Sequence, residues 1–153
     1  MTAVAKPFVQ IACVCEKVLH EKDGVASLIR VVDTYTMELP KDVPAGFTLA
    51  TQLTAFVSLK SGDVIGQFPV GLRLNQPNGK ALPTREMPVE FKGNESGANL
   101  QIEFALANPA VGLYWIDVLW GDEILTRIPF RLKTKASPQA STAEGAASGQ
   151  RSQ

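Results

Sequence analysis

Hydrophobic and polar residues alternate along most of this chain, as they do in β-strands whose two faces meet different surroundings. The alternation is clear over residues 47–59, 100–106 and 112–133, and turn-forming Gly, Pro, Asn and Asp residues separate these runs. No stretch carries the spacing and caps of a long amphipathic helix. The pattern therefore predicts an all-β, antiparallel sandwich of about seven to nine strands.

The first expected strand, Phe8–Cys15, is apolar on both faces, which is typical of a strand that is covered from both sides. Asp23 and Gly24 follow it and form a strong hairpin signal. The chain then returns through Val25–Leu39, which is rich in β-branched residues. We expect the two segments to pair as one long antiparallel ribbon around this turn.

Prolines indicate where the sheets end. Pro69 cannot donate a hydrogen bond to a neighbouring strand, which indicates an edge or a bulge at this position. Pro83 and Pro88 interrupt the extended stretch 81–91, and they predict a protected, irregular edge strand.

Residues 112–133 predict a hairpin around Gly121-Asp122-Glu123. A two-residue turn would place Arg127 and Arg131 on the apolar face of the preceding strand. An odd-length connection, most simply with a bulge, keeps that face apolar. Its predicted cross-strand pairs are Val118–Thr126, Ile116–Ile128 and Tyr114–Phe130. The apolar face of this hairpin is then formed by Tyr114, Ile116, Val118, Ile124, Ile128 and Phe130.

The opposite face of the same hairpin is the candidate partner surface of this chain. Tryptophan, flanked by leucine and arginine, is a composition enriched at the centres of protein interfaces. Two interpretations stay open: a loop or the segment before the tail covers this face, or a protein partner binds it, including a second copy of the chain. The candidate residues are Trp115, Leu119, Leu125, Arg127 and Arg131.

Composition and charge exclude several classes of partner. Fifteen basic residues balance fifteen acidic ones in the 153-residue chain, so no net field attracts nucleic acid or an anionic membrane. The apolar run near the N-terminus is too short to span a membrane, and no small-residue cleavage site follows it. We therefore expect a cytoplasmic protein without nucleic-acid or membrane partners.

The residues that usually carry catalysis or bind metals are sparse. His20 is the single histidine, and no local partner for nucleophilic catalysis accompanies it. Cys13 and Cys15 project from the same face of a strand, at or beyond the limit of disulfide geometry, and metal binding would require further ligands. We expect two small buried residues in a reducing compartment, no cofactor and no enzyme activity.

The chain divides into three parts. Residues 1–7 form a short N-terminal extension, and residues 8–133 form the sandwich domain. Residues 134–153 contain no aromatic residue and no Leu, Ile, Val or Met. Such a segment cannot offset the entropy of ordering, so a disordered, low-complexity tail is expected.

Several motifs carry a family resemblance over about Phe8 to Lys133. Tyr114 follows a corner at residues 108–112 and resembles the tyrosine corner of immunoglobulin-like folds, in which the hydroxyl bonds back to the preceding loop. On this corner and on further short motifs, the chain resembles a family of small uncharacterised bacterial proteins, a domain of unknown function with an immunoglobulin-like β-sandwich. The family often has glycine where this chain has Arg30, which leaves the bend at that position open. The further motifs are Cys15-Glu16, Ser27-Leu28-Ile29, Leu74–Gly79, Gly112-Leu113-Tyr114, Gly121-Asp122-Glu123 and Pro129-Phe130-Arg131-Leu132.

The resemblance implies a fold and transfers no catalytic residue. The function expected from the sequence is a non-enzymatic protein-binding or assembly module. The alternative is a small-ligand or enzymatic role in a pocket at the end of the sandwich, near His20 and Asp23.

Overall fold

The computed structural model describes residues 5–40, 42, 45–46 and 48–136. These residues form nine strands and no helix. The strands are β1 (Phe8–His20), β2 (Ala26–Val31), β3 (Thr34–Leu39), β4 (Ala50–Lys60), β5 (Ile65–Asn75), β6 (Arg85–Lys92), β7 (Gly97–Ala107), β8 (Gly112–Trp120) and β9 (Glu123–Ala136).

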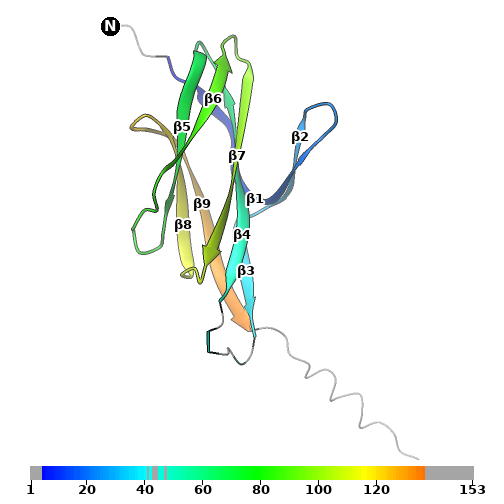
Figure 1. Ribbon diagram of the computed structural model, residues 1–153, viewed down its shortest axis with the longest axis vertical. Helices are drawn as coiled ribbons and strands as arrows, with labels where there is room; N and C mark the ends of the chain where they lie inside the picture. The colour runs from blue at the N-terminus through cyan, green and yellow to red at the C-terminus, as the bar shows by residue number, and fades with distance from the viewer. Residues whose placement is uncertain (1–4, 41, 43–44, 47, 137–153) are drawn as a thin grey trace, which may run out of the picture.

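The strands form two sheets that pack face to face (Figure 1). The first sheet has the order β2-β1-β4-β7, and the second has the order β3-β9-β8-β5-β6. The prediction of an all-β sandwich is therefore confirmed. The prediction of purely antiparallel sheets is wrong, because β3 pairs with β9 in parallel.

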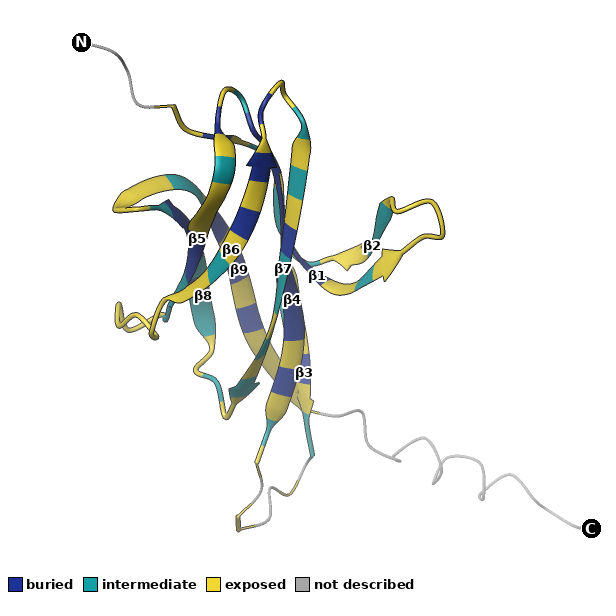
Figure 2. Cartoon of the chain, turned by 45° about the horizontal axis from the view of Figure 1, so that its top comes forward, coloured by how far each residue is buried: buried dark blue, intermediate teal, exposed yellow. Residues whose placement is uncertain are grey.

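The core lies between the sheets and follows the predicted alternation. Figure 2 shows buried and exposed residues alternating along β6 and β9, whereas β4 is buried without interruption from Leu53 to Leu59. Inward side chains from both sheets are shielded from water, which provides the main favourable free energy of folding. The most deeply buried large side chains include Val14, Leu53, Val57, Leu59, Val70, Phe91, Tyr114, Phe130 and Leu132.

The return segment after Asp23-Gly24 differs from the prediction, because it is two strands instead of one. β2 pairs with the second half of β1, and the resulting ribbon projects from the side of the sandwich (Figure 1). The chain then crosses to the other sheet: the Val32 amide donates to the Val14 carbonyl, and the Asp33 carbonyl accepts from the Arg131 amide. Arg30 has a φ of 55°, the left-handed conformation that glycine adopts without strain, so this chain adopts that conformation within β2 without glycine.

The last hairpin has the predicted register with a different turn. Val118 pairs with Thr126, and the other two predicted pairs are also confirmed. The turn itself spans only Gly121 and Asp122, and the extra residue is a bulge at Leu125. The bulge exchanges two side chains relative to the prediction: Leu125 packs against the core, and Ile124 is 43% exposed.

The prolines and the tyrosine corner also have clear positions. The Tyr114 hydroxyl donates to the Ala110 carbonyl at 2.6 Å, as predicted for a tyrosine corner. β6, which contains Pro88, is an edge strand of the second sheet. Pro69 lies in the interior strand β5, but the pairing of β5 with β8 covers only Gly71–Asn75, so Pro69 interrupts no ladder there.

The last strand extends beyond the sandwich end expected from the sequence. β9 continues to Ala136, three residues past Lys133, and Pro7 is fully buried just before β1. Most of the expected tail, residues 137–153, lies outside the described residues, as do residues 1–4 and Phe47. The described part of the chain has no helix with the length and apolar character required to cross a membrane.

Candidate functional site

Three neighbouring strands of the second sheet build a polar cluster on the face turned away from the first sheet. Asp117 on β8 lies opposite Arg73 on β5 and opposite Arg127 on β9. Two residues along β8, Trp115 lies opposite Asn75. Opposed side chains of antiparallel strands have Cβ atoms about 5 Å apart, so the register brings these groups into contact. We call this surface the Asp117 face and define it by Arg73, Asn75, Trp115, Asp117, Arg127 and Arg131.

The Asp117 carboxylate is the buried centre of this face, with 2% of its side chain exposed. Arg127 Nε donates to its Oδ1 at 2.7 Å, and Arg73 Nη2 donates to its Oδ2 at 2.8 Å. Asn75 Nδ2 donates to the same Oδ2 at 2.9 Å. Burial alone would raise the pKa of Asp117, but these hydrogen bonds and the charge of Arg127 outweigh it and hold the pKa below its usual value. The carboxylate therefore stays ionised and orients both guanidinium groups.

Trp115 is held by the same network. The guanidinium carbon of Arg127 lies 4.6 Å from the centre of the Trp115 ring, which is a cation–π distance. Asn75 Nδ2 also lies 3.3 Å from the Trp115 carbonyl and donates to it. The side chains of Arg73 and Arg127 remain 35% and 47% exposed. The face thus presents two fixed cations and an aromatic ring to solvent above a buried anion.

Of the five candidate residues from the sequence, two leucines are fully or partly shielded from solvent and three residues lie on the Asp117 face. Leu119 is on the expected side but only 8% exposed, because it packs beside Gly71 in a tight region next to Thr84. Leu125 was placed on the outer face, and this is wrong, because the bulge directs it against the core. The candidates that lie on the Asp117 face are Trp115, Arg127 and Arg131.

Sequence reasoning missed Arg73 and Asn75. The signal was present, because these residues alternate with Leu72 and Leu74, whose side chains point into the core region. The missing information was which strand lies next to β8. Since β5 and β8 are far apart in the sequence, the alternation within each strand does not reveal their pairing or register.

The region proposed for the alternative function forms no deep pocket. His20 Nε2 lies 3.0 Å from Gln101 Oε1, and Asp23 accepts a hydrogen bond from the Val25 amide at 3.1 Å. A shallow hollow on this projecting ribbon is lined entirely by polar residues, namely Glu21, Lys22, Asp23 and Ser27.

A larger hollow lies at the end of the sandwich near the β8–β9 turn. Its volume is about 690 Å³, within the range of small-molecule sites. Its walls include Phe68 and Trp120, whose ring centroids are 5.3 Å apart, and the exposed side chain of Ile65. Among the described residues that line it, Asp63 is the single charged one. The hollow therefore has apolar walls and few polar groups that could orient a ligand.

The two cysteines are free thiols; Cys15 is buried as expected, whereas Cys13, expected to be buried as well, is partly exposed. Burial raises the pKa of both, and for Cys13 the neighbouring Cys15 raises it further. Thiols with raised pKa values are poor nucleophiles at neutral pH. Within the described ranges, no three His, Cys, Asp or Glu side chains gather in a metal-binding arrangement.

Comparisons with known proteins identify a family, and the solved structures that match include two distant proteins. The model of DUF6941, a family of unknown function, matches residues 10–133. The alkylpurine DNA glycosylase AlkC of Pseudomonas fluorescens, bound to DNA with an abasic site analog, is 11% identical with a TM-score of 0.47, and the match covers 86% of this chain but 31% of that chain. An immunoglobulin-like protein from Pseudomonas aeruginosa is 16% identical with a TM-score of 0.45, over 86% of this chain and 100% of that chain. No curated protein matches the sequence.

Proposed function

Because the chain belongs to DUF6941, a family of unknown function, we propose its role from its own surface: it is a non-enzymatic protein-binding or assembly module that uses the Asp117 face. We assign its sandwich to the immunoglobulin-like class on the Tyr114 corner. The two free thiols, Cys13 and Cys15, fit a reducing, cytoplasmic environment, which we include in the proposal.

The observation that carries this proposal is the fixed arrangement of Trp115 and Arg127 over the buried Asp117. Tryptophan and arginine are the residue types that most often dominate the binding energy of protein interfaces. Their side chains usually lose rotational freedom on binding, which opposes association. Here the hydrogen bonds to Asp117 restrict Arg127 and Arg73 beforehand, so less entropy remains to be lost.

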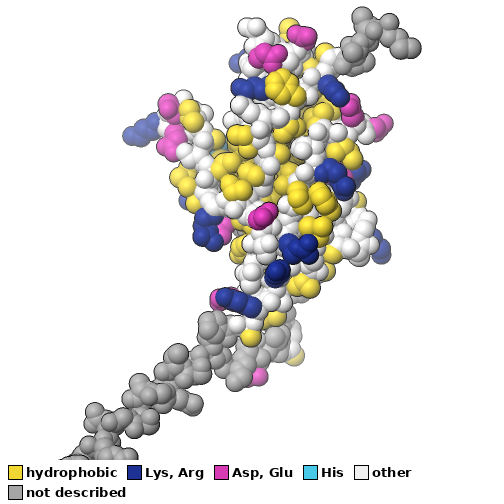
Figure 3. Space-filling model, turned by 180° about the vertical axis from the view of Figure 1, so that it is seen from behind, with side chains coloured by type: hydrophobic (Ala, Val, Ile, Leu, Met, Phe, Trp, Pro, Cys, Tyr) yellow, Lys and Arg dark blue, Asp and Glu magenta, His cyan; other side chains and the backbone are white. Residues whose placement is uncertain are grey.

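The charge of the face indicates the chemistry of the partner. Arg73 and Arg127 contact Asp117, and Arg131 lies farther along β9 on the same face, so the face carries three arginines and one carboxylate, an excess of two positive charges. An acidic protein surface complements this excess and would be steered toward it. Seen from behind, the molecule carries hydrophobic side chains across its middle, basic side chains below them and acidic side chains toward its upper edges (Figure 3).

The same geometry argues against proton-transfer chemistry at Asp117. A general base at neutral pH needs a pKa near the working pH and a free lone pair directed at substrate. Arg127, Arg73 and Asn75 occupy both oxygens of this carboxylate, and they lower its pKa. Asp117 therefore acts as a structural anion that positions the two arginines.

Charge-reversal variants of the full chain test the proposal. Wild type, Arg131→Glu and the control Lys22→Glu are used as baits in a native lysate, and each is checked for an unchanged melting temperature. Arg131 is exposed on the Asp117 face. The control Lys22→Glu changes the charge by the same amount, but at the tip of the β1–β2 ribbon. Light scattering on the purified proteins measures self-association in parallel.

We expect wild type and Lys22→Glu to retain the same acidic partner, or the same self-association, and Arg131→Glu to lose it. Equal binding by all three proteins would show that the Asp117 face is not the interface. A strictly monomeric protein that retains no partner would also contradict the proposed role.

The hollow at the end of the sandwich supports a second candidate function, the binding of a small apolar ligand. The observation that favours it is the aromatic pair Phe68 and Trp120 in a concavity of suitable volume. Quenching of tryptophan fluorescence by an apolar dye, compared between wild type and Phe68→Ala, tests this function separately.

A further inference from the structure

The edge strand β7 lacks the protection that the other edges have. The sheets end at β2 and β7 on the first sheet and at β3 and β6 on the second. β2 and β3 are only six residues long, and β6 carries Pro88 and four charged residues. β7 is 11 residues long, has no proline and carries one charged residue, Glu103. Short length, proline and charge are the usual means by which proteins prevent an edge from pairing with another chain.

The backbone of β7 presents unpaired groups along this edge. Arg85 Nη1 donates to the Glu103 carbonyl at 3.1 Å, which shows that the backbone groups of Glu103 point away from β4. Because such groups alternate in direction along a strand, those of Asn99, Gln101 and Ala105 point the same way. In the part of the chain that the structure describes, Arg85 is the only partner of these backbone groups.

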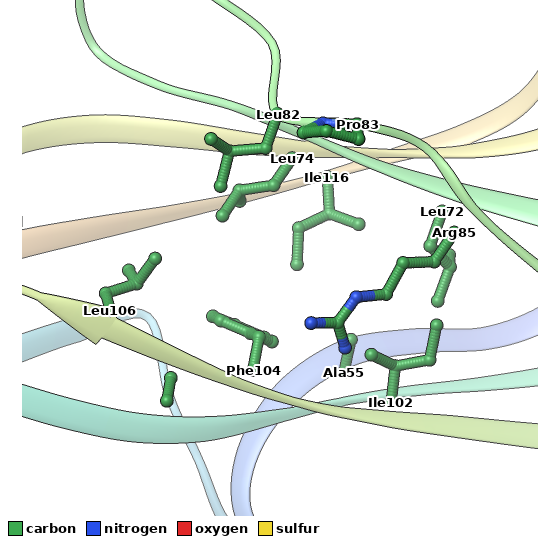
Figure 4. A pocket seen from close by; sticks show the side chains of 11 residues that line it. Ala55, Leu72, Leu74, Leu82, Pro83, Arg85, Ile102, Phe104, Leu106 and Ile116 are labelled. Atoms are coloured by element: carbon green, nitrogen blue, oxygen red, sulfur yellow. The ribbon is translucent and has the colours of Figure 1, made fainter.

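An apolar cavity lies beside this edge, between the two sheets. Figure 4 shows side chains of β7 facing those of β5, β8 and the segment before β6 across it. Ile102, Phe104 and Leu106 point toward the core side, yet each is only partly buried. The other apolar side chains of the lining that Figure 4 labels are Ala55, Leu72, Leu74, Leu82, Pro83 and Ile116.

The size of this cavity indicates what it accepts. Its volume is about 80 Å³. Pockets for small-molecule ligands are usually about 300–1,000 Å³, and an apolar cavity of about 150 Å³ holds one benzene molecule. The cavity beside β7 is therefore too small for such a ligand and suits a single aliphatic side chain. A strand added to β7 would direct alternate side chains toward it.

Arg85 lies at the opening of the cavity and brings a charge to it. Its guanidinium group extends over the space between Ile102 and Phe104 (Figure 4). Its one described hydrogen bond is to the neutral backbone carbonyl of Glu103, and none of the ion pairs among the described residues includes it. A carboxylate from an occupant would complement this cation at short range.

We propose that β7 binds an extended peptide segment of a partner protein as an added strand. The segment has an aliphatic side chain that enters the cavity and an acidic side chain that pairs with Arg85. Its backbone pairs with the outward backbone groups of Asn99, Gln101 and Ala105, in the mode of recognition in which hydrogen bonds give affinity and side-chain pockets give specificity. This site is separate from the Asp117 face and does not depend on the function proposed for that face.

Two occupants from this protein itself fit less well. Residues 137–153 contain no Leu, Ile, Val, Met or aromatic residue, so they offer no large aliphatic side chain to the cavity. A second copy could offer its own β7 strand as the added strand. All side chains of β7 that point toward the core are apolar, and Glu103, the single acidic residue of this strand, points to the opposite face. A second copy of β7 therefore does not supply the carboxylate that faces Arg85.

A peptide selection on the full chain tests this proposal. Random eight-residue peptides displayed on phage are selected against wild type, and the selected peptides are synthesised and measured by fluorescence anisotropy. Ala105→Pro removes an amide that points to the free side and so blocks an added strand without breaking the pairing with β4. Ala105→Ser is the matched control, Arg85→Gln removes the cation, and Trp115→Ala changes the Asp117 face only.

The expected peptides alternate apolar and polar residues and share an Asp or Glu at a fixed position. Ala105→Pro should weaken their binding by about tenfold or more, because at least one backbone hydrogen bond is lost and the strand is displaced. Arg85→Gln should weaken binding severalfold, and Ala105→Ser and Trp115→Ala should leave it unchanged. Hydrogen exchange should slow at Gln101 and Glu103 on binding.

Three results would overturn the proposal. The first is equal affinity of the selected peptides for Ala105→Pro and wild type. The second is a set of selected peptides without a shared acidic position together with unchanged binding to Arg85→Gln. The third is a dimer in light scattering that Ala105→Pro dissociates, since the occupant would then be a second copy. Loss of binding in Trp115→Ala alone would assign the peptides to the Asp117 face instead.

Discussion

Replacing Asp117 with asparagine tests whether the buried carboxylate holds the outer face of the second sheet together. The substitution keeps the size of the side chain and removes its charge. One oxygen remains for Arg127 or for Arg73, and the new NH₂ group then faces the donors of the other arginine or of Asn75. The change therefore leaves two guanidinium groups without their counter-charge.

The magnitude follows from the exposure of the partners. Hydrogen bonds to charged groups contribute about 1.5–3 kcal/mol each to stability. Arg73 and Arg127 are 35% and 47% exposed, however, so water compensates part of their loss. We expect Asp117→Asn to lower the free energy of unfolding by about 2 kcal/mol, which corresponds to about 8 °C in the melting temperature of a domain of this size.

Urea unfolding followed by tryptophan fluorescence measures this change, and Trp115 lies close enough to report on the site. Arg131→Gln is the control, because Arg131 is exposed on the same face and its loss should change stability by no more than about 0.5 kcal/mol. Equal stability of Asp117→Asn and wild type at neutral pH would refute the structural role of the carboxylate.

The pH dependence gives a second measurement of the same contribution. The pKa of Asp117 is lowered in the folded state, so its stabilising contribution is present above the unfolded pKa of about 4 and is lost as the pH falls through the folded pKa. The difference between wild type and Asp117→Asn should therefore shrink as the pH decreases below about 4. A difference that is constant down to pH 2 would show that the charge is not its cause.

Two further substitutions test the core and a tight turn. Thr51→Val should raise the free energy of unfolding by about 1 kcal/mol, because the Thr51 hydroxyl is buried without a hydrogen-bond partner among the described residues and valine has nearly the same shape. Urea unfolding measures the gain. A loss of stability would show that the hydroxyl is hydrogen-bonded. Gly112→Ala should lower the melting temperature by several degrees, because Gly112 has a φ of +135° and an added Cβ would lie 3.0 Å from Pro77 Cβ. The control Gly97→Ala should melt like wild type, because Gly97 has neither a positive φ nor a close contact. Equal melting temperatures of the two variants would contradict this explanation.

Most local features of the fold were predictable from the sequence. The period-two pattern identified the core positions of β7 and β8, and the apolar face of the last hairpin fixed its register through Val118 and Thr126. These predictions succeed because a strand with one buried face is strongly constrained to a single register.

The errors arose where a single residue or a distant partner decides the structure. The bulge at Leu125 satisfies the same register as a longer turn does, so the pattern alone did not separate the two. The division of the return segment at Val32 and Asp33 depends on hydrogen bonds to two different sheets. The Asp117 face depends on the adjacency of β5 and β8, and no local pattern in either strand specifies its neighbour.

The parallel pairing of β3 with β9 also constrains how this domain assembles. Thr34 lies beside Arg131, so a strand near the beginning of the chain receives its neighbour only from the last strand of the sandwich. During synthesis, β3 therefore has no partner in its own sheet until β9 has left the ribosome. Closing such a long loop is entropically unfavourable before it gains contacts, so formation of this pair is expected to come late and to limit the folding rate.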